Sequence, residues 1–185
     1  MYGPVIEGKL VRLRPPQTED AAVMIGWFGD MEVTRLLLLR HPPSLEMEKE
    51  WLDRAAGNPD EVLWVVEHKG ATIGTTHIHL IDWKNGFATT GTIIGDKSLW
   101  GKGLGGEVMQ LRTRYAFTQL PLRKLKAGYI DGNEASAKAQ AAAGYREIGR
   151  HRADMFVDGK WRDHVMTEVM REDWEKARGE TAKTD

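Results

Sequence analysis

The hydrophobic and polar positions of the chain follow strand and helix periods in turn. Residues 8–16, GKLVRLRPP, alternate aliphatic side chains with arginine before two prolines, which is typical of a short strand. Residues 18–30 and 44–60 place apolar side chains at helical spacing behind a threonine or serine, so each is predicted to be a helix. Residues 31–43, with four consecutive leucines, either join the core or line an apolar cleft.

The central part of the chain predicts an antiparallel meander. Residues 61–70, 71–83 and 87–96 read as three strands, and the pair Asn85-Gly86 is a strong hairpin signal. The later part is predicted to contain, in order, a helix over 107–119, a strand over 123–131, an alanine-rich helix over 133–144 and two strands around Asp158-Gly159.

These elements predict a mixed α/β fold. We expect a single domain over residues 1–178, with a central, mostly antiparallel sheet flanked by helices, because no repeat or linker divides the pattern. Residues 179–185 are polar and are predicted to be a tail outside the core.

Composition narrows the classes of function. The chain has 185 residues, of which 41% are hydrophobic and 29% charged, so it can bury a sizeable core. A formal net charge of −1 gives no sign of a nucleic-acid groove, and no apolar run approaches membrane-spanning length, so we expect a cytoplasmic protein. The absence of cysteine excludes disulfides, thiolate metal ligands and a cysteine nucleophile.

A dense group of glycines is the strongest candidate for chemistry. Gly101, Gly103, Gly105 and Gly106 precede a predicted helix, where unpaired N–H groups and the helix dipole favour anions. A P-loop is excluded because Lys102 is followed by glycine rather than serine or threonine. The dinucleotide pattern G-x-G-x-x-G matches, but five residues separate the glycines from the preceding strand, so a nucleotide-dependent oxidoreductase is the weaker alternative.

Two motifs in order point to a known family. Residues 100–105 follow a loop pattern [Q/R]-x-x-G-x-[G/A] except that Trp100 replaces the polar residue, and residues 133–136 read N-x-x-S, with Gly144-Tyr145 after the next helix. Over residues 8–174 the chain resembles the GNAT superfamily of acyl-CoA-dependent N-acyltransferases, in particular the branch of ribosomal-protein N-terminal acetyltransferases.

The resemblance implies where acetyl-CoA binds. The fourth predicted strand, residues 87–96, would splay from the fifth, residues 123–131. The pantetheine arm would lie in the gap, and the pyrophosphate would bind to the glycine loop. From the residues alone, a surface position is the favoured reading for Lys102 and Lys138, and a core position for Leu104. Asn133 could equally be a helix cap. The cofactor contacts that the resemblance implies are Ile93, Ile94, Gly95, Gly101, Lys102, Gly103, Leu104, Gly105, Gly106, Asn133 and Lys138.

Catalytic candidates are fewer. Many members of the family carry a glutamate on the fourth strand as base, and the matching position here is Thr89. His77 and His79 lie on one face of the third predicted strand, residues 71–83. They could be exposed surface residues, or one of them could accept a proton during catalysis. Ser136 could meet the thioester sulfur or simply be a solvated serine at the helix start.

Other polar residues are weaker candidates. Glu67 and Asp82 look like surface residues at strand ends. His151 and His164 could line the acceptor cleft, and the sequence offers them no partner at metal-ligand spacing, so no metal is predicted.

The predicted function is acetyl-CoA-dependent N-acetyl transfer, direct from thioester to a primary amine of a protein N-terminus, an amino acid or a small molecule. The alternative is a non-catalytic acyl-CoA-binding or sensor module, because the usual glutamate is absent. Residues 31–43 and the final hairpin are expected to form the acceptor groove. We expect neither nucleic acid nor membrane as a partner, and the resemblance is compatible with a homodimer.

Overall fold

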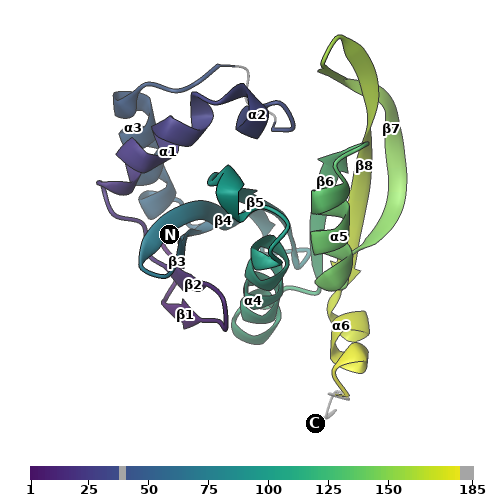
Figure 1. The fold of residues 1–185 in the computed structure, drawn as a ribbon. Coiled ribbons are helices and arrows are strands. Elements are labelled where there is room, and N and C mark those ends of the chain that lie inside the picture. Colours follow the sequence, from purple (N-terminus) through teal and green to yellow (C-terminus); the bar gives the residue numbers. More distant parts are fainter. Residues whose placement is uncertain (38–40, 180–185) are drawn as a thin grey trace.

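The computed structural model describes residues 1–37 and 41–179. It contains one eight-stranded sheet in the order β1-β2-β3-β4-β5-β6-β8-β7, with helices on both faces (Figure 1). The mixed α/β class is therefore confirmed. Residues 180–185, nearly all of the predicted tail, lie outside the described part, and so does part of the four-leucine segment.

The strands and helices follow the predicted order. The strands are β1 (Ile6–Glu7), β2 (Arg12–Arg14), β3 (Val62–His68), β4 (Ala71–Asp82), β5 (Phe87–Ile94), β6 (Lys124–Ile130), β7 (Arg146–Val157) and β8 (Lys160–Met170). The helices are α1 (Asp20–Phe28), α2 (Met31–Thr34), α3 (Leu45–Gly57), the 3-10 turn η1 (Lys97–Leu99), α4 (Leu104–Gln119), α5 (Glu134–Ala142) and α6 (Arg171–Ala177).

The short elements β1, α2 and η1 were not predicted, and one helix cap and one helix start differ from the prediction. Ser44 caps α3 as expected, its hydroxyl accepting from the N–H of Met47 at 3.2 Å. Thr18 is not the cap of α1, which begins after Glu19 without a side-chain cap. The helix predicted from residue 107 begins three residues earlier, because Gly103 at φ 81 turns the chain directly into α4.

Strand alternation divides the sheet into two faces. Trp64, Ile78 and Leu125 face α4 and the larger hydrophobic core. Leu63 and Val65 face the other way, into a smaller core with α1 and α3. We call the first side the α4 face and the second the α1 face.

The sheet opens between its fifth and sixth strands. β5 and β6 run parallel but pair only at Phe87–Thr89 with Lys124–Lys126. From Thr90 onward β5 stays with β4, whereas β6 stays with β8 as far as Ile130. The predicted splay is therefore present, and Figure 1 shows the two halves of the sheet diverging toward the ends of these strands. We call this opening the wedge.

Candidate active site

The glycine loop lies where β5 leads into α4. Gly101 and Gly103 adopt left-handed backbone angles, with φ 75 and 81, that favour glycine. Within the described residues, none of the backbone N–H groups of residues 101–106 donates to another backbone carbonyl in this turn. Leu104 is buried in the core below the loop, whereas Lys102 is exposed. The loop thus offers free donors at a helix start, the arrangement that binds phosphate groups.

The departure at Trp100 has a structural explanation. Its indole N–H donates to the carbonyl of Ile94 at 2.8 Å and so ties the loop to the end of β5. The N–H of Trp100 is therefore used within the protein and holds the loop in place.

The edge of β5 differs in detail from the predicted cofactor contacts. The carbonyl of Ile93 points at Gly74 on β4, lying 2.1 Å from where a Cβ on that glycine would be. Gly95 donates its N–H to Ile73 at 2.8 Å. Because successive residues of a strand point to opposite edges, the backbones of Thr92 and Ile94 face the wedge instead.

The start of α5 forms the opposite wall of the wedge. Asn133 caps this helix, its side-chain oxygen accepting from the N–H of Ser136 at 3.0 Å. The hydroxyl of Ser136 accepts from the amide of Gln140 at 3.1 Å, and that amide also donates to the carbonyl of Gly128. The buried Gln140 therefore fixes the hydroxyl of Ser136, while Lys138 is exposed.

The two predicted histidines share a face and a carboxylate partner. The rings of His77 and His79 are stacked, with centroids 4.3 Å apart and planes at 15°. Nδ1 of His77 lies 3.2 Å from Oε1 of Glu61, which immediately precedes β3. This hydrogen bond holds the pKa of Glu61 below its usual range, so its carboxylate is ionised and can only accept. The proton therefore sits on Nδ1 of His77.

The other nitrogen of His77, Nε2, lies over Gly91 of β5. A Cβ on Gly91 of β5 would lie 2.4 Å from Nε2, so glycine alone leaves room for the ring there. Gly91 is two residues beyond Thr89, the last β5 residue paired with β6. Nε2 of His77 thus lies over Gly91 on the α1 face, close to the apex of the wedge, while Thr89 lies opposite His79.

His79 is held neutral. Burial, and then the neighbouring His77, lower its pKa to about 4. At neutral pH His79 therefore carries no charge and is a weak base, which favours His77 as the proton acceptor.

A buried cation lies beneath the same stretch of β5. Arg112 of α4 is 1% exposed. Its Nη1 donates to the hydroxyls of Thr76 and Thr92 and to the carbonyl of Gly91, at 2.9, 2.7 and 2.8 Å. These partners are uncharged oxygens rather than carboxylates, so the wedge has a positive charge on its α4 face.

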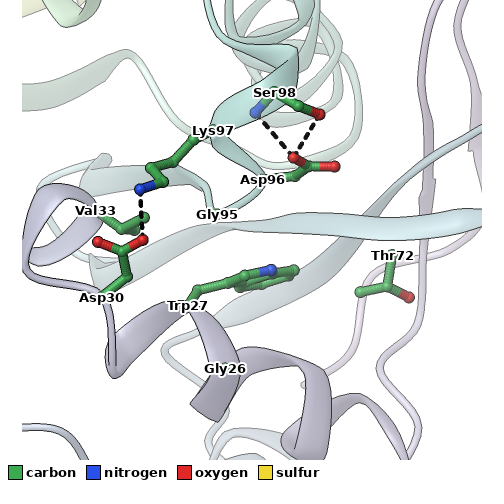
Figure 2. A pocket seen from close by; sticks show the side chains of 9 residues that line it. All are labelled: Gly26, Trp27, Asp30, Val33, Thr72, Gly95, Asp96, Lys97 and Ser98. Carbon is green, nitrogen blue, oxygen red and sulfur yellow. Dashed lines mark hydrogen bonds and ion pairs between the residues drawn. The ribbon is translucent and has the colours of Figure 1, made fainter.

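Two pockets flank the α1–α2 region. The smaller, about 410 Å³, lies between α1 and η1 and is shown in Figure 2, with the indole of Trp27 packed over Gly95. Lys97 bridges to Asp30 and Glu32 at 2.7 Å each, which fastens α2 to the end of β5. This pocket is thus partly closed by an ion pair.

The larger pocket, about 840 Å³, joins the two segments expected to form the acceptor groove. Its walls come from α1 and α2 on one side and from the β7–β8 hairpin on the other. The lining residues are Phe28, Gly29, Met31, Thr34, Arg35, Leu37, His41, Pro42, Ile130, Asp154, Met155, Phe156, Val157, Asp158 and Trp161. Arg35 and Asp158 face each other across it at 3.1 Å.

The remaining polar candidates are engaged elsewhere. Glu67 pairs with Arg12 and Arg14, and Asp82 accepts hydrogen bonds from Asn85. His151 and His164 come together on the β7–β8 hairpin with Asp154, a third group that sequence spacing did not reveal.

Comparison with known proteins identifies the class. The family described as "Acetyltransferase (GNAT) domain" matches residues 11–146. An uncharacterized N-acetyltransferase, p20 of Bacillus licheniformis, is 25% identical over 88% of this chain and 93% of its own. The [ribosomal protein uS5]-alanine N-acetyltransferase of Escherichia coli K12 is 34% identical over 48% of this chain and 45% of its own.

A solved structure shares the whole fold. The spermidine N-acetyltransferase from Vibrio cholerae, in complex with CoA and spermine, superposes with a TM-score of 0.83 at 18% identity, covering 90% of this chain and 99% of that one. The chain belongs to the GNAT acetyltransferases. It is an N-acetyltransferase, an enzyme of a family that uses acetyl-CoA, so the sensor and oxidoreductase alternatives are set aside. Among the described helices none is long and apolar enough to span a bilayer.

Proposed function

We propose that the protein transfers an acetyl group from acetyl-CoA, held in the wedge, directly to an α-amino group of a peptide or amino acid. The observation that carries this proposal is the wedge itself, with the glycine loop at its outer end and the Glu61–His77 pair at its apex. The loop N–H groups would bind the pyrophosphate. The backbone of Thr92 and the N–H of Ile94 would pair with the pantetheine arm, in place of the predicted contacts at Ile93 and Gly95, since the carbonyl of Ile94 already accepts from Trp100.

The acid–base roles follow from which groups reach the wedge. Amide formation removes a proton from the amine and releases a thiolate. Nε2 of His77 would accept that proton, directly or through water, because Glu61 holds the ring in the required tautomer. Ser136 would donate a hydrogen bond to the departing thiolate, with Gln140 setting its position. No covalent enzyme intermediate is needed.

The acceptor class follows from the cost of a neutral amine. An ε-amino group with a pKa of about 10.4 is about 2.5 units harder to deprotonate than an α-amino group, which is about 3.4 kcal/mol. Because Thr89 stands where many members of the family have a glutamate, a histidine is the only proposed base. A histidine alone does little to offset this difference in deprotonation free energy. The alanine N-acetyltransferase activity of the uS5 relative supports an α-amino acceptor.

The charges of the larger pocket point the same way. Among its described lining residues, Asp158 is neutralised by Arg35, which leaves Asp154 as the acid without an arginine or lysine partner. A polyamine with several positive charges would need more acids than this. A peptide with one amino group and apolar side chains fits the lining of Phe28, Met155 and Trp161.

The test compares turnover on matched peptides that carry either a free α-amino group or a free lysine ε-amino group, between pH 6 and 9, by detection of the released thiol. We expect the α-amine to be preferred at pH 7. His77→Gln and Glu61→Gln should lower kcat on the α-amine with little change in acetyl-CoA affinity. Equal turnover on both amines at pH 7 would refute the acceptor class, and unchanged kcat in both variants would refute the proton route.

A further inference from the structure

A cluster of nitrogen and oxygen ligands lies on the β7–β8 hairpin, apart from the Glu61–His77 pair and the glycine loop. His151 of β7 and His164 of β8 are direct cross-strand partners. Their rings meet edge to face, with centroids 6.2 Å apart. Asp154 completes the group: one ligand atom from each of the three side chains lies within 4.8 Å of the others.

A β-bulge brings Asp154 to the histidines. Between the pairs His151–His164 and Met155–Arg162, residues 152–154 of β7 stand opposite a single residue of β8. Ala153 takes a left-handed conformation at φ 50, and its N–H donates to the carboxylate of Asp163 at 3.0 Å. Bulges of this kind re-aim side chains. Without it, strand alternation would separate Asp154 from His151.

The distances suit an ion better than a direct hydrogen bond. Nδ1 of His151 and Nδ1 of His164 each lie 3.8 Å from the same oxygen, Oδ2 of Asp154. That separation is too long for a hydrogen bond. Tetrahedral zinc with bonds of about 2.0–2.1 Å needs ligand atoms about 3.3–3.4 Å apart, which small side-chain rotations would provide.

One histidine is already oriented. Nε2 of His164 lies 2.4 Å from where a Cβ on Gly128 would be, so its ring fits over β6 because residue 128 is glycine. With Nε2 directed there, Nδ1 is the nitrogen that faces Asp154. The side chains of His151 and Asp154 are 59% and 43% exposed, so an ion could enter from solvent and keep water as a further ligand.

We propose that His151, Asp154 and His164 form a binding site for a divalent transition-metal ion of the zinc type. Two imidazoles and one carboxylate are the ligands that zinc, nickel and copper accept, whereas calcium and magnesium require oxygen. Since Asp154 also lines the larger pocket, the bound ion would stand at its rim with an open coordination position. This site does not depend on the proposed proton route, although it shares Asp154 with the pocket proposed for the acceptor.

The test is titration of the chelator-treated protein, without a histidine tag, with Zn²⁺ by calorimetry, and with Co²⁺ by visible absorption. We expect one ion per chain with visible Co²⁺ bands. His164→Ala and Asp154→Asn should each weaken binding about tenfold or more. His68→Gln is the control, because His68 lies on β3 with Nδ1 against the carbonyl of Leu10 and should leave binding unchanged.

The outcomes are distinct. No saturable binding, or equal binding in the wild type and in the Asp154 and His164 variants, overturns the proposal. If His164→Ala does not fold, the exposed His151→Ala decides in its place. Acetyl-CoA binding, measured in parallel by thermal shift, should be unchanged in the hairpin variants, so failure here is separable from failure of the acetyltransferase assignment.

Discussion

Replacing His79 with glutamine should flatten the dependence of stability on pH. Burial and the neighbouring His77 lower the pKa of His79 to about 4 in the folded protein, against about 6.5 in an unfolded chain. Above about pH 6.5 the side chain is neutral in the folded and the unfolded state, so it does not change the free energy of unfolding. Between about pH 6.5 and 4 the unfolded chain binds a proton here and the folded chain does not, so stability falls as pH falls.

The size of the effect follows from the two pKa values. A difference of about 2.5 pKa units corresponds to an upper limit of about 3.4 kcal/mol when the whole interval is crossed. Between pH 7 and pH 5 the upper limit is about 1.8 kcal/mol, and solvent screening of this partly exposed side chain lowers it. His79→Gln keeps a polar side chain on the strand but cannot bind this proton, so its stability should fall less than that of the wild type over the same interval, by up to about 1.8 kcal/mol.

Urea unfolding of the wild type and of His79→Gln at pH 7, 6 and 5 measures this difference. The contributions of the carboxylates to the pH dependence are the same in both proteins, so they cancel in the comparison. Thr89→Ser is a matched control, since it changes the residue opposite His79 and retains the histidine. Its pH profile should follow the wild type. Equal losses in wild type and His79→Gln, or a proton-NMR titration of His79 centred near pH 6.5, would show that the histidine is not held neutral and that the choice of His77 as base is unfounded.

Three further predictions concern the wedge. Acetyl-CoA at ~100 times its Kd should stabilise the protein by about 2.7 kcal/mol in thermal or urea unfolding, and Gly105→Val should abolish that shift whereas Gly26→Ala, in α1, should not. Ser136→Ala should lower kcat with acetyl-CoA affinity unchanged; Gln140→Leu should do the same, and a weakened affinity in both would contradict the leaving-group role. Arg112→Met should raise the pKa of His79 by NMR titration, because Arg112 contributes to lowering it, and should lower kcat; an unchanged titration would refute that coupling.

Local patterns predicted much of this molecule because they depend on few residues. Strand alternation placed His77 and His79 on one face, and their rings are indeed stacked. The dense glycines marked a turn that needs left-handed angles at Gly101 and Gly103. Local patterns also predicted the order of the main elements, whereas the splay came with the family resemblance, which extends over most of the chain.

What the sequence did not reveal depends on register between distant segments. Glu61 looked like the first residue of a strand, and its role appears only when β3 and β4 pair and bring it to His77, sixteen positions away. The register between β4 and β5 decides which backbone groups of β5 face the wedge. Those of Thr92 face it, whereas those of Ile93 face β4. The hairpin bulge breaks strand periodicity, so spacing could not bring Asp154 to His151.

Under the proposed function, the two faces of the sheet would divide the charges that acetyl transfer creates. Nε2 of His77 lies on the α1 face and would take up the proton of an amine that is bound in the larger pocket. Arg112 and Ser136 lie on the α4 and α5 side, where the thiolate would leave. Hydrogen bonds to neutral oxygens offset only part of the free-energy cost of burying a guanidinium. We propose that Arg112 stabilises negative charge that forms in the wedge near Gly91 and Thr92, which would account for a buried cation at this place.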